Sequence, residues 1–258
     1  CINGLLLQSF DTDQSLANRM AGLMRDSHRF HVDTDGWYVY RENRWMPTNA
    51  GIVSSLVSTA LRGLSAVFYS QALSQVGSNA TRGASANLLR ISQQIASSAR
   101  VTSVMGLLRS TPSLQQRGEF RQTPGILNAP NVTFDLRQSK RIDESRDLHL
   151  TQACGPEFSQ VKLATIVNAI QIDPDSLPKL FAENAPHWTK FLSDIFCNDE
   201  HLIRFVRRVL GLALSGFNVE ECFYLLHGRG ANGKSTFLSV LRHVFNEYSV
   251  SIPFQSII

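Results

Sequence analysis

The alternation of apolar and polar positions divides the chain into helical and β-type stretches. In residues 1–28, leucine and methionine side chains repeat at the spacing of one helix face, which predicts a helical lead-in. Residues 29–47 instead alternate aromatic and polar side chains around the dipeptides Asp-Gly at 35–36 and Glu-Asn at 42–43. This alternation with turn residues between the runs predicts strands joined by tight turns.

The next stretch, from Ile52 to Leu108, carries leucine, valine and isoleucine at helical spacing in a serine- and alanine-rich background. We expect about three helices, the first capped by Thr48 or Asn49. Glycine weakens a helix, so the expected breaks are the glycines of this region. These are Gly63, Gly77, Gly83 and Gly106.

The second half begins with β-type residues at 124–142, with turn residues Ala129-Pro130-Asn131 in the middle, which predicts another hairpin. From Pro186 onward the pattern predicts two helices that are separated near 198–199, the second ending at Gly216. The expected fold class is therefore an α+β domain, mainly helical with β-hairpins, before the motif described next.

Composition narrows the class of protein only a little. The 258 residues suffice for one large domain or two modest ones, and the hydrophobic fraction of 43% is ordinary for a globular protein. A net charge of +4 suits a partner that carries phosphates, although so small an excess is a weak indication. No run approaches about 20 apolar residues, so no membrane span is expected. The first residue is not methionine and the last residues read as the start of another element, which suggests a piece of a longer polypeptide.

Cysteine usage gives no sign of a metal site or a disulfide framework. The four cysteines are far apart and none forms a C-x-x-C pair, so we expect reduced thiols in a cytoplasmic protein. They are Cys1, Cys154, Cys197 and Cys222.

The strongest chemical signal lies at residues 228–235, which read GRGANGKS and fit the pattern G-x-x-x-x-G-K-[ST]. An apolar run at 222–228 precedes it and predicts a buried strand, while residues 234–245 after it carry apolar side chains at helical spacing. Strand, glycine-rich loop and helix are the context that a phosphate-binding loop requires. The assignment depends on a strand leading into the loop and on Lys234 pointing toward it.

Each residue type in the loop has a role in holding a triphosphate. Glycines let backbone N–H groups approach an anion closely, and the following helix directs its positive end to the same place. Lys234 adds a charge for the β- and γ-phosphates and is the candidate catalytic residue, while Ser235 is the candidate Mg²⁺ ligand. The alternative is a glycine-rich turn with an exposed lysine. The predicted ATP-binding residues are Gly228, Arg229, Gly230, Ala231, Asn232, Gly233, Lys234, Ser235 and Thr236.

Hydrolysis also requires an acidic group that holds the metal, usually at the end of a neighbouring strand. Only 24 residues follow Lys234 here, and Glu247 is their single acid. We therefore expect the cradle for the nucleotide in this chain without the catalytic acid.

Residues 188–236 resemble a known family. The run GANGKST at 230–236 is similar to the Walker A segment of superfamily 3 helicases, and the residues before it resemble the phage and plasmid primase–helicases, relatives of the poxvirus primase–helicase. The hairpin at 126–142 is similar to that family through Asn131, Asp135 and Leu136. The matching positions in the run before the loop are Trp188, Phe191, Leu192, Asp199, Glu200, Leu210, Gly211, Leu214, Gly216, Glu221, Phe223 and Gly228.

The resemblance implies a replicative DNA helicase of a phage, plasmid or related mobile element that uses Mg–ATP. It implies an accessory, collar-like domain at residues 1–186 and the first part of an α/β, AAA+-like P-loop ATPase domain at residues 187–258. It further implies a DNA partner, a homo-oligomer that is a hexamer, a fused or associated primase, no membrane, and a location in the cytoplasm of a bacterial or virus-infected cell.

Two other functions stay open at this point. The chain can serve chiefly as a non-catalytic oligomerisation or interaction module of a replication protein. A small P-loop kinase is disfavoured, because such kinases commonly open with the loop, whereas here more than 200 residues precede it.

Minor candidates have ordinary structural explanations beside their functional ones. His28 and His31 with two nearby aspartates have metal-like spacing but lie in the predicted hairpin. The tryptophans at 37 and 45 can stack on bases or pack across strands. Three arginines spaced i, i+3, i+4 can contact phosphate or form a solvated helix face. They are Arg204, Arg207 and Arg208.

Overall fold

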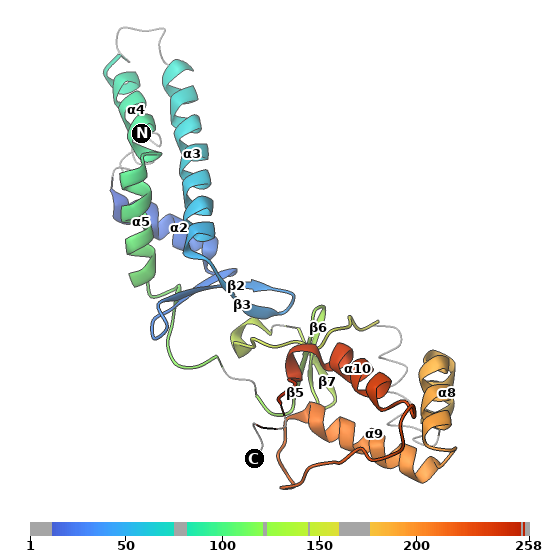
Figure 1. Cartoon of the computed structure of the whole chain (residues 1–258). Helices are drawn as coiled ribbons and strands as arrows, with labels where there is room; N and C mark the ends of the chain where they lie inside the picture. The colour runs from blue at the N-terminus through green and yellow to red at the C-terminus, as the bar shows by residue number, and fades with distance from the viewer. Residues whose placement is uncertain are drawn as a thin grey trace. The chain divides into compact units, whose positions relative to one another are not determined.

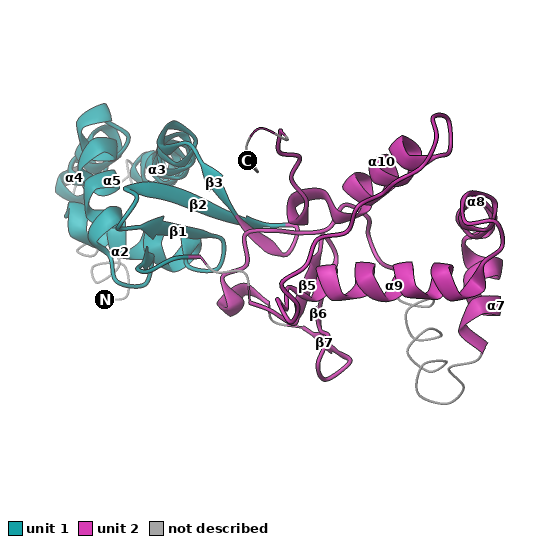
Figure 2. Cartoon of the chain, turned by 60° about the horizontal axis from the view of Figure 1, so that its bottom comes forward, with its two compact units in different colours: residues 1–41, 46–119 teal, residues 42–45, 120–258 magenta. Residues whose placement is uncertain are grey.

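A computed structural model of the chain describes residues 12–74, 82–120, 123–143, 145–159, 176–253 and 255. The chain forms two compact units, each with its own core (Figure 2). Unit 1 comprises residues 1–41 and 46–119, and unit 2 comprises residues 42–45 and 120–258. This division into compact units does not test the domain boundary expected between residues 186 and 187, which stays a prediction.

The described residues of unit 1 include four helices (Figure 1). Each turns an apolar stripe inward at helical spacing, as Val53, Val57 and Leu61 do at i, i+4 and i+8, and together the stripes form one buried cluster. The Ser65 hydroxyl donates to the carbonyl of Ser92 at 2.6 Å and ties the third helix of the chain to the fourth. The helices are α2 (Asp13–Met24), α3 (Ala50–Ser74), α4 (Arg82–Ile95) and α5 (Ser98–Ser110).

A small sheet in the order β3-β2-β1-β4 completes unit 1. β1 and β2 pair antiparallel with Phe30 opposite Trp37, and the two rings lie 5.3 Å apart. The expected strands and turns at 29–47 are confirmed, with β3 beginning inside the residues that belong to unit 2. The strands are β1 (His28–His31), β2 (Gly36–Arg41), β3 (Arg44–Thr48) and β4 (Gln115–Gln116).

The helices of this region are confirmed, but the breaks expected at Gly63 and Gly106 are wrong, because both residues lie inside helices. Gly83 lies in the first turn of α4, next to the interval between α3 and α4, while position 77 falls outside the described residues. A glycine destabilises a helix interior by about 1 kcal/mol, which is small beside the burial of a complete apolar stripe. Another interruption precedes α5, where the Ser97 hydroxyl accepts the N–H of Arg100. At the start of α3 the cap is Asn49, whose Oδ1 accepts the N–H of Gly51 at 2.6 Å.

The absence of a membrane span stays a prediction. Among the described residues one helix, α3, is long and apolar enough to cross a membrane by length and composition. Five of its side chains are buried in the core of unit 1, while Ile52, Val67 and Leu73 are exposed.

Unit 2 contains a three-stranded antiparallel sheet in the order β5-β6-β7. Ala129 pairs with Val132, so the residues at 130–131 form the two-residue turn of the hairpin, as the sequence predicts. The third strand was not expected. The strands are β5 (Ile126–Ala129), β6 (Val132–Asp135) and β7 (Lys140–Ile142).

The helices of unit 2 follow the predicted pattern after residue 186. Asp199 caps α9 by accepting the N–H of Leu202 at 3.0 Å, and Gly216 ends it in the left-handed region. The short helix α7 has Pro178 in its first turn. The elements are η2 (Arg146–Leu148), α7 (Leu177–Asn184), α8 (Pro186–Ile195), α9 (Glu200–Ser215), α10 (Lys234–Phe245) and η4 (Asn246–Tyr248).

Candidate functional site

The glycine-rich loop at 228–233 turns sharply into α10. Gly233 is the residue before the helix and has φ of +82°, a conformation that favours glycine. A Cβ at this position would lie 2.7 Å from Cγ2 of Ile195 on α8, so the close packing also excludes a side chain. Ala231 occupies the left-handed region as well, with φ of +57°. The loop is thereby wound tightly against α8.

The Lys234 side chain folds back over the loop. Its ammonium donates to the carbonyl of Gly228 at 3.0 Å, to the carbonyl of Arg229 at 3.2 Å and to Oδ1 of Asn232 at 2.6 Å. The expectation that Lys234 points toward the bend is confirmed. The positive charge therefore lies inside the ring of backbone that a phosphate chain would enter.

The start of α10 leaves backbone donors available at the same place. The first helical hydrogen bond runs from the N–H of Phe237 to the carbonyl of Gly233 at 2.8 Å, and no side chain caps the helix. The N–H groups of Lys234, Ser235 and Thr236 thus lack helical partners and lie at the positive end of the helix dipole. The side chains of Ser235 and Thr236 are exposed.

An aromatic cluster on α8 holds this helix start in position. The ring of Trp188 stacks on Phe237 of α10 at 5.8 Å with an angle of 13°, and on Phe191 at 5.4 Å. Phe237 and Leu192 are buried in the same cluster. Two of the residues that carry the family resemblance, Trp188 and Phe191, therefore belong to the aromatic cluster that packs against the first turn of α10, next to the phosphate loop.

The strand expected at 222–228 is wrong. These residues are extended but pair with no strand in the described part of the chain, and Phe223 and Leu225 are 89% and 80% exposed. A strand exists only through hydrogen bonds to a neighbour, and none of the three described strands of unit 2 lies beside this run. One of the two conditions set for the nucleotide site is therefore not met.

The acid that follows the loop is used elsewhere. Glu247 lies 3.1 Å from Nε of Arg44 and accepts the N–H of Ala153 at 2.9 Å, so its carboxylate holds the end of α10 to the residues at 42–45. The described residues contain no group of three histidine, cysteine or acidic side chains that could hold a metal. Lys234, Ser235 and the helix start fit a Mg-bound triphosphate, whereas no described carboxylate is placed to complete the metal site.

Comparison with known proteins assigns most of the chain before the phosphate loop to a family. The model of the family described as D5 N terminal like matches residues 17–197, more than half of the chain. The chain belongs to the D5 N-terminal-like family. The match runs from unit 1 through α8 and ends before α9, so the phosphate loop lies beyond it.

A curated relative extends the likeness over nearly the whole chain. The protein printed as "Putative helicase L207/L206" of Acanthamoeba polyphaga mimivirus is 21% identical over 262 residues, which cover 95% of this chain. The chain spans about a quarter of the length of that relative.

Within this D5 N-terminal-like chain, the hairpin residues that carry the resemblance have structural roles. The Asn131 side chain donates to the carbonyl of Phe158 at 2.8 Å and accepts its N–H at 3.0 Å. Asp135 accepts the N–H groups of Arg137 and Gln138 and fixes the turn to β7.

The metal-like histidines belong to the small sheet of unit 1. Nε2 of His31 lies 2.7 Å from the carbonyl of Gly118, and its other ring nitrogen contacts Thr34. Burial, with a smaller effect of Arg41, lowers the pKa of His28 below its usual value. The two tryptophans at 37 and 45 are 2% and 0% exposed, which makes them packing residues.

The arginine triplet of α9 is more informative in the structure than in the sequence. Its members line a cavity opposite α7, a helix that the pattern analysis did not define. The i, i+3, i+4 spacing was visible in the sequence, but the wall that faces it was not.

Proposed function

We propose that this chain is part of an ATP-dependent replicative DNA helicase of superfamily 3, from a phage, plasmid or related mobile element. Family membership and the mimivirus relative support the coarser class. The observation that carries the finer assignment is the convergence of Lys234, the uncapped start of α10 and the wound loop at 228–233. The proposal rests on these features alone, because residues 222–228 form no strand in the described part of the chain.

The residues of the loop divide the work of holding Mg–ATP. The N–H groups at the start of α10 hold the phosphates through oriented dipoles. Lys234 exchanges its present backbone carbonyls for phosphate oxygens, which carry full charges and bind it more strongly. The Ser235 hydroxyl, exposed at the first turn, is placed to hold the metal. Bound Mg–ATP supplies the phosphoryl group whose transfer to water drives unwinding.

The remaining features of the proposal follow from the helicase class. The full-length protein acts as a hexamer on single-stranded DNA at a replication fork, with a fused or associated primase. It works in the cytoplasm of a bacterial or virus-infected cell. The basic balance of the chain, +4, favours a polyanionic partner.

Substitution of Lys234 by alanine tests the nucleotide site. A hydrogen bond to a charged group contributes about 1.5–3 kcal/mol, so Lys234→Ala should weaken ATP binding by roughly 10- to 100-fold. In the full-length protein it should abolish ATP hydrolysis with unchanged folding. The control is Lys190→Ala on α8, an exposed lysine paired with Asp194. Near-normal turnover by Lys234→Ala would remove the assignment.

A second candidate function rests on the exposed apolar run after α9. Val219, Phe223 and Leu225 are 72%, 89% and 80% exposed, which is typical of a surface that another chain covers. We infer that a non-catalytic assembly module is the alternative to the helicase. An ATP titration of this chain, together with its mass in solution, separates the two. Clear ATP binding favours the helicase, and assembly without ATP affinity favours the module.

A further inference from the structure

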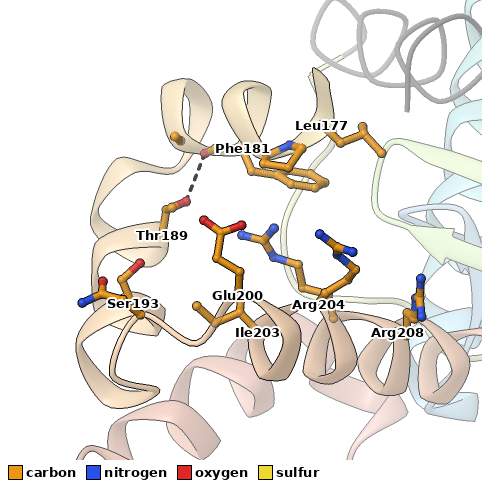
Figure 3. A pocket seen from close by; sticks show the side chains of 12 residues that line it. Leu177, Phe181, Thr189, Ser193, Glu200, Ile203, Arg204 and Arg208 are labelled. Carbon is orange, nitrogen blue, oxygen red and sulfur yellow. Dashed lines mark hydrogen bonds between the residues drawn. The ribbon is translucent and has the colours of Figure 1, made fainter. Parts of the chain in front are cut away.

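Three helices of unit 2 enclose a cavity of about 640 Å³ on the far face of α8 from the phosphate loop. Figure 3 shows α7 and α8 on two sides of it, with α9 below. Thr189 and Ser193 of α8 line the cavity, whereas Phe191 and Ile195 of the same helix face Gly233. The cavity is thus separate from the proposed ATP site.

The α9 side of the cavity carries excess positive charge. Arg204, Arg207 and Arg208 line it with a single acid, Glu200. Among the described residues, none of the three arginines forms an ion pair with a carboxylate. Arginines at a cavity without carboxylate partners are suited to an anionic ligand, because the guanidinium fork matches the oxygens of a phosphate.

The α7 side of the cavity is apolar and aromatic. Leu177 and Phe181 line it, and Figure 3 shows both on α7 across from Arg204. The guanidinium of Arg207 lies over the ring of Phe181, 5.0 Å from its centroid. The Thr189 hydroxyl donates to the carbonyl of Phe181 at 3.3 Å and helps to hold α7 against α8. A flat apolar surface therefore faces a basic one across the cavity.

We propose that this cavity binds one nucleotide unit of single-stranded DNA. The phosphate is held by Arg204 and Arg208, and the base packs against Leu177 and the Phe181–Arg207 stack. A nucleotide joins an anion to a flat aromatic ring, so it matches both walls, whereas an acidic peptide would use only the basic one. The choice of a DNA strand over a free nucleotide rests on the proposed function.

The test measures binding of a short fluorescein-labelled oligothymidylate to the chain by fluorescence anisotropy, without ATP. The variant Arg204→Gln/Arg208→Gln removes two charges and keeps a polar side chain at each position. The control, Arg62→Gln/Arg90→Gln, removes two charges from exposed positions on α3 and α4. Circular dichroism melting verifies that both variants fold.

We expect the cavity variant to bind at least about tenfold more weakly, with the control within about twofold of the parent chain. The slope of log K against log salt should become shallower by about 0.7, because the two arginines neutralise one phosphate of a single strand. Arg207→Lys, which keeps the charge but loses the stacked fork, should also weaken binding. Equal losses in the cavity variant and the control would overturn the proposal.

Two competitors identify the source of the ligand. The first competitor is thymidine monophosphate. If it displaces the oligonucleotide at an equal concentration of nucleotide units, the cavity binds a free nucleotide and the proposal of a DNA strand is overturned. The second competitor is polyglutamate. If it competes equally well, the proposal that the cavity binds a nucleotide is overturned. Failure of ATP binding through Lys234 leaves these measurements unaffected, so the two proposals fail separately.

Discussion

Two apolar runs of unit 2 look alike in sequence and differ in structure. Residues 126–135 form the β5–β6 hairpin, with Phe134 buried beneath Phe158 at a ring distance of 5.5 Å. Residues 222–228 are more apolar and more aromatic, yet they are unpaired among the described residues and largely exposed. In the first run, β5 pairs with β6 across a two-residue turn. The second has no neighbouring strand in the described chain.

The difference shows that an apolar run indicates a segment that favours burial, but does not indicate which surface will cover it. The hairpin is a local structure, because its turn brings the two halves together over a short loop. The run before the phosphate loop depends on a partner from elsewhere. Mutations in the hairpin should therefore change stability, while mutations around the loop should change binding or assembly.

The largest contrast should come from the same substitution in each run. Phe134→Ala removes a buried ring and should destabilise the chain by about 3–5 kcal/mol. Phe223→Ala removes an exposed ring and should change the free energy of unfolding by less than about 0.5 kcal/mol. Urea unfolding of both variants measures the two values. Comparable losses would mean that residues 222–228 are buried in solution.

The next effect concerns the polar centre of the hairpin. Asn128 is fully buried; it donates to the carbonyls of Asn43 and Gln152 and accepts the hydroxyl of Thr133 at 2.7 Å. Asn128→Ala leaves these groups unpaired and should destabilise by about 2–3 kcal/mol in urea unfolding. The exposed neighbour Asn131 provides the matched control. Its alanine variant should lose less than about 1 kcal/mol, since water replaces its hydrogen bonds.

The smallest expected effect is a difference in reactivity between two thiols, measured without altering the fold. Cys154 is buried with the hairpin, and burial raises its pKa above the ordinary 9.0, whereas Cys222 is exposed beside the unpaired run. In a Cys1→Ser/Cys197→Ser background, a thiol reagent at pH 8 should label Cys222 rapidly and Cys154 only after unfolding. The folded state holds the Cys154 proton more tightly, so this stabilising contribution is complete below pH 9 and declines above it. Rapid labelling of both thiols in the folded chain would contradict the comparison.

The helices show where sequence patterns succeed. The stripes of α3, α4 and α5 and the caps of α9 follow from spacing and residue type alone. The positions of the breaks did not follow, because the tertiary burial of a stripe outweighs the weak preference of one glycine. The strand β7 was missed because three exposed or half-buried residues carry too little pattern to be seen.

The candidate site was predictable to the extent that it is local. The pattern at 228–235 indicated the bend, the helix start and the orientation of Lys234, all of which depend on neighbours within a few residues. The support from Trp188 and the engagement of Glu247 with Arg44 join residues far apart in the chain. No rule based on the spacing of residues predicts such contacts.

The amino-acid sequence by itself determined the helices, the hairpins and the phosphate loop, because each is stabilised by contacts between residues that are close along the chain. Only the tertiary structure decided that residues 222–228 pair with no strand of the described chain, that α10 packs on the aromatic rings of α8, and that the arginines of α9 face α7. These outcomes depend on which surfaces meet in space, and burial can be satisfied by any surface of suitable shape and polarity.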